Sequence, residues 1–185
     1  MKIGLIGRPK TGKTTIFNAL TRSQAEVAEY GSGKLEPNIA VVDVDDPRVL
    51  VLSGMYEPKK TIFATIDFID FAGVGRSEGK NDMFSGAAMG LVKTADALAV
   101  VVRNFQNDVL NSTLGPPNPL SEADSVNAEL VLSDLVLAET RLERIEADHK
   151  RGRKTPQSQA EQKILESLHE SLLQDRPIRE IDLTD

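Results

Sequence analysis

Short apolar runs alternate with segments of helical character over the first hundred residues of the chain. Runs rich in β-branched and aromatic residues are typical of strands. A run that is apolar at every position, such as Ala97–Val102, is typical of a parallel strand covered on both faces. This alternation predicts an α/β fold with a mostly parallel, doubly wound sheet. The predicted strands are Lys2–Ile6, Leu35–Val44, Thr61–Phe71 and Ala97–Val102, and the predicted helices are Lys13–Thr21 and Met83–Thr94.

The pattern changes after the rigid break at Gly115–Pro119. Apolar residues then recur at alternating intervals of 3 and 4, which is the spacing of a coiled coil. Ser121 with Asp124 is predicted to cap this helix, and Gly152 and Pro156 to end it. A second periodic segment follows, so the sequence predicts an antiparallel helical hairpin. The predicted seam residues are Ala128, Val131, Leu135, Ala138, Leu142 and Ile145 on the first helix, and Ala160, Ile164, Leu168 and Leu172 on the second.

A glycine-rich segment, GRPKTGKT at Gly7–Thr14, stands between the first predicted strand and the first predicted helix. It matches the pattern G-x-x-x-x-G-K-[ST], in which backbone N–H groups and the helix dipole cradle phosphates. We expect Lys13 to contact the β- and γ-phosphates and Thr14 to offer its hydroxyl to Mg²⁺. The alternative is a tight strand-to-helix turn with an incidental lysine. The predicted nucleotide contacts are Gly7, Pro9, Lys10, Thr11, Gly12, Lys13, Thr14 and Thr15.

A second motif, DFAG at Asp70–Gly73, follows the third predicted strand. In GTPase-type P-loop proteins a D-x-x-G element places its carboxylate near the Mg²⁺ shell and its glycine N–H near the γ-phosphate. We therefore predict Asp70 as a metal ligand with Thr14. Gly73 is a predicted nucleotide contact and, with Lys13, a catalytic residue. A plain strand-ending turn is the alternative.

The composition is that of an ordinary globular protein, with 40% hydrophobic and 27% charged residues. No apolar stretch approaches the ~18–20 residues of a membrane span. The absence of cysteine excludes disulfides and thiolate zinc sites, and it fits a cytoplasmic protein. A net charge of −6 argues against nucleic-acid binding by the whole domain. Positive charge nevertheless gathers at the hairpin tip, in Lys150, Arg151, Arg153 and Lys154.

These motifs, in this order, resemble the YchF (Obg-like ATPase) family of P-loop NTPases. The resemblance extends from Met1 to about Leu183 and covers about half of the family's architecture. The family continues into further strands, a base-recognition element and a TGS domain. For this chain, the resemblance implies a partial nucleotide-binding domain at 1–119, an inserted hairpin at 120–176 and a return segment at 177–185. Besides the two motifs above, it is carried by FNALT at Phe17, LEPN at Leu35, DPR at Asp46, VVRNF at Val101 and NAELVLSDL at Asn127.

The resemblance implies Mg²⁺-dependent hydrolysis of ATP or GTP and association with ribosomes or RNA, for which the hairpin tip is a candidate contact. Hydrolysis should be slow, because Val74 stands where Ras-like enzymes carry a water-orienting Gln. Arg76, Glu78 and Lys80 are candidates for positioning the water. A binding module without turnover is the main alternative, and a phosphate-transferring kinase is disfavoured because the D-x-x-G element stands in the switch position. Sheet edges left open by a partial domain would favour self-association.

Two positions depart from the family pattern. Lys34 replaces a switch threonine whose hydroxyl can reach Mg²⁺, so Ser32 would substitute for it, Lys34 would contact the γ-phosphate, or the switch would close poorly. Lys10 replaces an asparagine that in some related GTPases holds K⁺. We hypothesise that the Lys10 ammonium takes the place of that cation. A Lys10 that simply faces solvent is the alternative.

Overall fold

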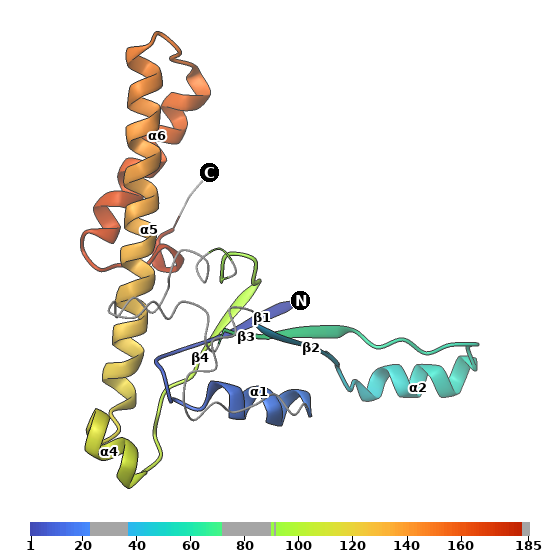
Figure 1. Cartoon of the computed structure of the whole chain (residues 1–185). Coiled ribbons are helices and arrows are strands. Elements are labelled where there is room, and N and C mark those ends of the chain that lie inside the picture. The colour runs from blue at the N-terminus through green and yellow to red at the C-terminus, as the bar shows by residue number, and fades with distance from the viewer. Residues whose placement is uncertain (23–36, 72–89, 91, 183–185) are drawn as a thin grey trace. The chain divides into compact units, whose positions relative to one another are not determined.

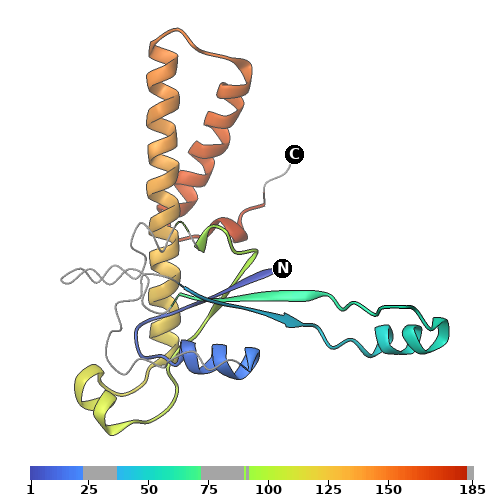
Figure 2. The ribbon, with the colours of Figure 1, turned by 45° about the vertical axis from the view of Figure 1, so that its right-hand side comes forward.

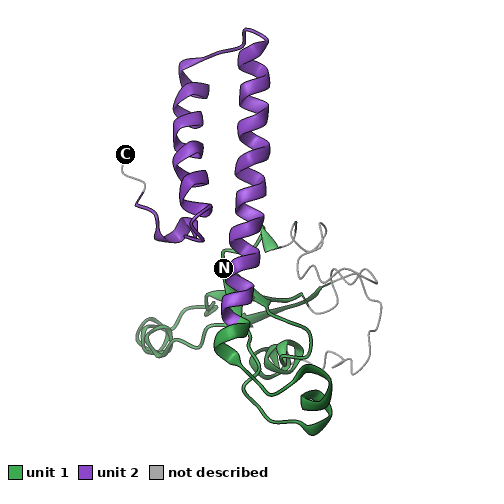
Figure 3. Ribbon diagram, turned by 90° about the vertical axis from the view of Figure 1, so that its left-hand side faces the viewer, with its two compact units in different colours: residues 1–122 green, residues 123–185 purple. Residues whose placement is uncertain are grey.

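The computed structural model describes residues 1–22, 37–71, 90 and 92–182 (Figure 1). The chain forms two compact units, Met1–Glu122 and Ala123–Asp185 (Figure 3). The domain boundaries expected from the sequence stay a prediction. None of the described helices has the length and apolar composition to cross a membrane.

A four-stranded sheet organises the first unit. Its strands are β1 (Lys2–Ile6), β2 (Asn38–Asp43), β3 (Thr65–Asp70) and β4 (Ala97–Val100), in the order β2-β3-β1-β4. β1 runs parallel to both β3 and β4, and β2 pairs with β3 antiparallel. The predicted α/β class with a mostly parallel sheet is therefore confirmed. Because β1 and β3 are parallel neighbours, the residues that follow them lie at one edge of the sheet.

Helix α1 (Lys13–Thr21) begins where the sequence predicts and packs against this sheet (Figure 1). Its Phe17 is among the most deeply buried side chains, as are Leu5 and Ile6 of β1. Burial of these apolar side chains fixes the start of α1 beside the end of β1.

Two helices of the first unit are missing from the sequence prediction. Helix α2 (Pro47–Tyr56) begins with proline at its first position and is capped by the Asp46 carboxylate, which accepts from the Arg48 N–H. Helix α4 (Asp108–Leu114) is capped by the Asn107 side chain. Asp-Pro and Asn-Asp are recognisable helix starts. Neither helix has a buried residue, so the apolar periodicity that identifies packed helices is lacking.

Three predicted strands are shorter than expected. β2 covers Asn38–Asp43, whereas the sequence predicts Leu35–Val44, of which residues 35 and 36 lie outside the described residues. β3 begins at Thr65; in the segment before it, the Ala64 carbonyl accepts from the Val44 N–H (2.8 Å), but Thr61–Ala64 are not part of the strand. β4 ends at Val100. The prediction that this strand is covered on both faces is wrong, because Leu98 and Val100 are partly exposed. β4 is one of the two edge strands of the described sheet, and an edge strand has a neighbour on one side only. Of the predicted helix Met83–Thr94, most lies outside the described residues.

The predicted hairpin is present, with α5 (Pro119–Lys150) and α6 (Pro156–Leu172) side by side and antiparallel (Figure 2). A short 3-10 turn, Ile178–Glu180, follows. The predicted Ser121–Asp124 cap is wrong. Asn118 accepts from the Ser121 N–H (3.2 Å), so α5 starts earlier than its apolar repeat. Thr155 and Ser158 form a reciprocal capping box at the start of α6.

Burial confirms most of the seam predicted on α5, where Val131, Ala138 and Ile145 are buried and Leu135 and Leu142 half-buried. Ala128, at the start of the predicted seam, is wrong, because it is exposed. On α6 the predicted face is partly wrong, because Ala160 and Ile164 are exposed and Leu165 packs into the core instead. Successive steps of four residues advance about 40° beyond a full turn each, so a series of them drifts off one face. The core of this unit consists of Val131, Ala138 and Leu172, with Leu135, Leu165 and Ile178 packed against it.

Polar contacts join the two helices outside the seam. Arg141 donates two hydrogen bonds to the Glu161 carboxylate, at 2.6 and 2.9 Å. These hydrogen bonds lower the pKa of Glu161 and raise that of Arg141. His149 Nε2 and Ser158 Oγ lie 2.7 Å apart near the tip. The seam and these contacts together set the register of the hairpin.

We predict that the hairpin depends on its seam, which two adjacent leucines can test. Leu172 is 1% exposed and Leu173 is 60% exposed. Leu172→Ala should lower the free energy of unfolding by about 2–5 kcal/mol, because it leaves a cavity. Leu173→Ala should change it by less than about 0.5 kcal/mol. Urea denaturation followed by circular dichroism measures both, and equal losses would show that the seam is misplaced.

Candidate nucleotide-binding site

The loop after β1 is shaped by a close approach of backbone to backbone. Gly7 has φ 147°, and a Cβ at this position would lie 2.2 Å from the Val101 carbonyl oxygen. The Val101 N–H in turn donates to the Ile6 carbonyl (2.7 Å). Only glycine fits this contact, which holds the loop against the strand beside it.

The first turn of α1 is open toward the loop. Gly12 occupies the N-cap position with φ 95°, and no described side chain caps this end of the helix. The Gly12 carbonyl already accepts from the Ile16 N–H (2.9 Å), so helical bonding starts at once. The N–H groups of the first turn have no acceptor inside a helix. With the positive end of the helix dipole they provide a site for an anion such as a phosphate.

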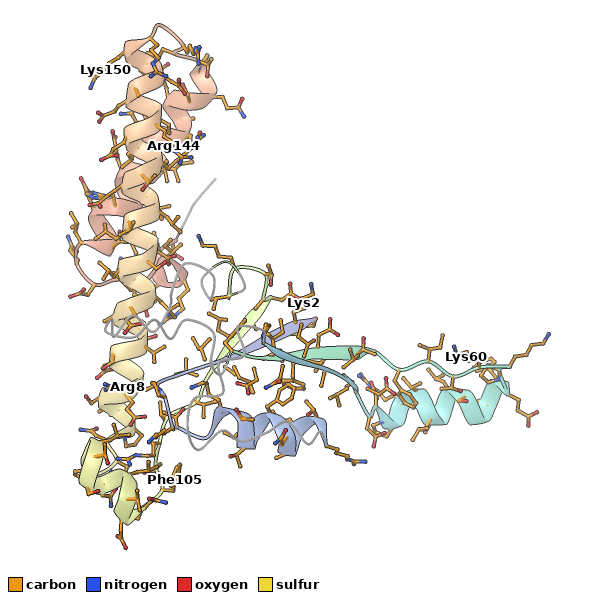
Figure 4. The ribbon with its side chains drawn as sticks, viewed as in Figure 1. Lys2, Arg8, Lys60, Phe105, Arg144 and Lys150 are labelled. Carbon is orange, nitrogen blue, oxygen red and sulfur yellow. The ribbon has the colours of Figure 1, made fainter. Side chains whose placement is uncertain are left out.

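The Lys13 ammonium lies over the loop. Its Nζ donates to the carbonyl oxygens of Gly7 (2.9 Å) and Arg8 (2.7 Å). Arg8 itself lies at the bend between β1 and α1 (Figure 4). This places one positive charge above the glycine loop, where the sequence predicts the β- and γ-phosphates.

A hydroxyl and a carboxylate meet beside the loop. The Thr14 hydroxyl, in the first turn of α1, donates to Asp70 Oδ2 at the end of β3 (2.7 Å). Asp70 is 0% exposed. Asn38, at the start of β2, has its amide nitrogen 3.5 Å from the same oxygen. The sequence assigned no role to Asn38, although it ends the LEPN segment; its place beside Asp70 follows from the antiparallel register of β2 on β3.

The chemistry of this pair fits the predicted metal. Mg²⁺ prefers hard oxygen ligands and is usually held by one or two carboxylates together with phosphate oxygens and water. Thr14 and Asp70 supply a hydroxyl and one carboxylate. Among the described residues there is no cluster of three or more metal-binding side chains.

The other predicted contacts lie in the same loop. Thr11 is buried, and its hydroxyl donates to the Arg8 carbonyl (3.0 Å). Lys10 has a left-handed backbone (φ 65°), and its role as a substitute cation stays a prediction. Pro9 in the loop and Thr15 in the first turn of α1 are both exposed. The positions predicted for the switches, Lys34, Gly73 and Val74, lie outside the described residues, as do Ser32, Arg76, Glu78 and Lys80.

Phe105 is a neighbour of the loop that the sequence did not assign to the site. It follows β4 and is partly exposed. A Cβ on Gly12 would lie 3.9 Å from its ring. VVRNF at Val101–Phe105 contributed to the resemblance, but nothing in its spacing shows that its phenylalanine reaches the loop.

A mostly parallel sheet with a G-x-x-x-x-G-K-[ST] loop between its first strand and first helix is the structure of P-loop proteins. Within that class, the chain belongs to the family of 50S ribosome-binding GTPases, which its residues 2–139 match. This match and the similarities that follow confirm the expected resemblance.

Several proteins named ribosome-binding ATPase YchF are similar over nearly the whole chain. The Bacillus subtilis protein is 31% identical over 182 residues, 98% of this chain and 49% of its own length. The Pasteurella multocida protein is 35% identical over 182 residues, 98% of this chain and 50% of its own length. The structure of the Schizosaccharomyces pombe YchF GTPase superposes with a TM-score of 0.77 at 31% identity, covering 100% of this chain and 50% of that one. The chain thus spans about half the length of these relatives.

We predict that Gly7→Ala disrupts the loop, because the added methyl group collides with the Val101 carbonyl. Gly115→Ala is the matched control, since Gly115 also has positive φ (78°) but has open space where an added methyl group would lie. Both changes carry the backbone strain of about 1 kcal/mol or more, and only Gly7→Ala adds the collision. The free energy of unfolding should therefore fall further for Gly7→Ala. Equal losses would contradict the close approach.

Proposed function

We propose that the chain binds ATP or GTP with Mg²⁺ and slowly hydrolyses the bond between the β- and γ-phosphates. The observation that carries the proposal is the 2.7 Å contact between Thr14 and the buried Asp70, beside a glycine loop covered by the Lys13 ammonium. Membership of a GTPase family and similarity to proteins named ATPases support it.

Phosphoryl transfer needs positioning and charge stabilisation more than a reactive side chain. In the proposed complex the phosphate oxygens replace the Gly7 and Arg8 carbonyls as partners of the Lys13 ammonium. The N–H groups in the first turn of α1 would bind the same oxygens, and Thr14 and Asp70 would hold the metal. Mg²⁺, when bound, supplies a charge that offsets the negative charge of the phosphates. Lys13 and the loop N–H groups stabilise the charge that develops as the bond breaks.

Slow turnover follows in this proposal from Val74. Its isopropyl group cannot hydrogen-bond a water molecule, so the chain lacks the glutamine with which Ras-like enzymes orient the attacking water. Gly73 is proposed to donate its N–H to the γ-phosphate. The location is proposed to be cytoplasmic, where ribosomes and nucleotides are both available.

A ribosomal partner is proposed for the hairpin tip, because relatives are named ribosome-binding. At the tip, Lys150 lies 3.8 Å from Glu146 and Arg153 lies 3.6 Å from Asp148. Arg151 and Lys154 are exposed and make no ion pair with the described residues. Figure 4 shows Lys150 at the end of α5 and Arg144 further down the same helix. Exposed cations of this kind are suited to RNA phosphates.

We predict that hydrolysis depends on Lys13 and on the Thr14 hydroxyl. Lys13→Ala should lower phosphate release about 10²–10³-fold, as removal of one charge-stabilising donor does. Thr14→Val should raise the Mg²⁺ concentration needed for nucleotide binding about 10–100-fold, whereas Thr14→Ser keeps the hydroxyl and should not. Calorimetry with ATP and GTP and an assay of released phosphate measure these effects.

An exposed lysine of the other unit, changed in Lys163→Ala, is the control and should leave both measurements unchanged. Mg²⁺-dependent binding without phosphate release would support a binding module instead. Transfer of a labelled γ-phosphate to an acceptor would support a kinase. If neither nucleotide gives a heat of binding, the proposed site is wrong.

We predict that the basic tip binds ribosomal RNA by charge. Reversing Arg151 and Arg153 to Glu should weaken binding to ribosomes at least about tenfold and reduce its dependence on salt, with a slope lower by about two. Arg144→Glu with Lys163→Glu is the control, since it makes the same change in net charge on the shafts of the hairpin. Cosedimentation with ribosomes over a series of salt concentrations measures both. Equal weakening would indicate an effect of net charge alone.

A further inference from the structure

Helix α2 presents apolar side chains to solvent on several sides. From Val49 to Tyr56 it contains no charged residue, and none of its residues is buried. A helix that is apolar all round is normally buried in a protein core. Contiguous exposed apolar surface of this kind marks a site of interaction.

One face of α2 already contacts another segment of the chain. The hydroxyls of Ser53 and Thr61 lie 2.5 Å apart, which turns this face toward the segment that returns to β3. Val49, one turn earlier on the same face, is half-buried. The opposite, outward face carries Leu50, Val51 and Met55, which are 54%, 63% and 69% exposed.

Gly54 adds a notch to the outward face. It lies within the helix, where glycine costs about 0.5–1 kcal/mol relative to alanine. Nothing lies within 4 Å of the position that its Cβ would occupy, so no contact with the described residues accounts for the missing side chain. On this face the notch lies one helical turn after Leu50, which could fill an equivalent notch on a second helix.

Charge at the two ends of α2 indicates what covers the face. Asp43, Asp45 and Asp46 precede the helix and Arg48 lies in its first turn, so this end is acidic on balance. Lys59 and Lys60 follow the helix together with Glu57, so that end is basic on balance (Lys60 is labelled in Figure 4). Asp45 and Lys59 are equally distant in sequence from Leu52, near the middle of the helix. A second α2 packed antiparallel about this middle therefore sets the acidic end of each helix beside the basic end of the other. The same arrangement sets Leu50 against Gly54 of the second copy on both sides of the axis.

We propose that α2 is a homodimerisation helix, which pairs with α2 of a second copy of this chain in an antiparallel, two-fold arrangement. The two-fold symmetry follows because one self-complementary surface serves both subunits. The acidic end disfavours the alternative of an anionic lipid surface, which would repel it. A helix of ten residues is short, about 15 Å, so we expect a weak dimer with a dissociation constant of about 10–100 μM.

Sedimentation of the intact chain over a concentration series tests the proposal first. The wild type should dimerise, and Val51→Glu should weaken the dimer at least about tenfold, because it places a charge in the contact. Val51→Glu should leave the circular dichroism and the binding of Mg²⁺-ATP unchanged, since the side chain is exposed and distant from the phosphate loop. A wild-type monomer at about 1 mM, or a dimer indifferent to Val51→Glu, overturns the proposal.

A charge exchange tests the antiparallel orientation. Asp45→Lys and Lys59→Asp should each weaken the dimer about three- to tenfold, because each creates two like-charge contacts across the axis. The double exchange should restore the wild-type affinity. If the double variant dimerises no better than the single variants, these two ends do not meet.

Single cysteines give an independent test, because the wild-type chain contains none. Counterparts at Val51 would lie about 3 Å apart along the axis of the pair, and counterparts at Met55 about 9 Å apart. Val51→Cys should therefore form an oxidised dimer much faster than Met55→Cys, because a disulfide requires Cα atoms within about 7 Å. Equal rates would overturn the antiparallel pairing. Flotation of a monomeric chain with anionic vesicles would overturn it in favour of a lipid surface.

Discussion

A buried carboxylate must be satisfied by the groups around it, and in this chain that requirement falls on Asp70. The Thr14 hydroxyl and the Asn38 amide approach the same oxygen of Asp70, so the end of β3, the first turn of α1 and the start of β2 are held around one atom. A carboxylate at 0% exposure that lost these partners would cost several kcal/mol. The same pairing brings the donors of the proposed metal site together before any nucleotide arrives.

The glycine loop is a second constraint, of steric origin. Gly7 must lie against the Val101 carbonyl for β1 and β4 to continue side by side, and Gly12 must take positive φ for α1 to start at the end of the loop. These two glycines therefore serve the fold and the phosphate site together. Lys13, bonded to two loop carbonyls, already occupies the position from which it would meet phosphates.

The two units differ in how their apolar residues are used. In the hairpin, the buried side chains of α5 and α6 face one another, and polar pairs such as Arg141 with Glu161 lie outside. In the first unit, α2 leaves its apolar residues exposed although their number and type match those of a core helix. Pairing of α2 with a second copy would remove this difference, because the exposed face would then be buried as the hairpin seam is.

The sequence by itself determined the elements that a local repeat or a steric requirement specifies: β1, α1, the glycine loop and most of the seam of α5. Each depends on residues close together in the chain, so spacing alone predicts it. Only the tertiary structure decided the exposure of β4, which depends on its place at the sheet edge, and the α6 face, which depends on its register against α5. Asn38 and Phe105 joined the site for the same reason: strand pairing and chain folding bring them to Asp70 and Gly12, and local spacing records neither contact.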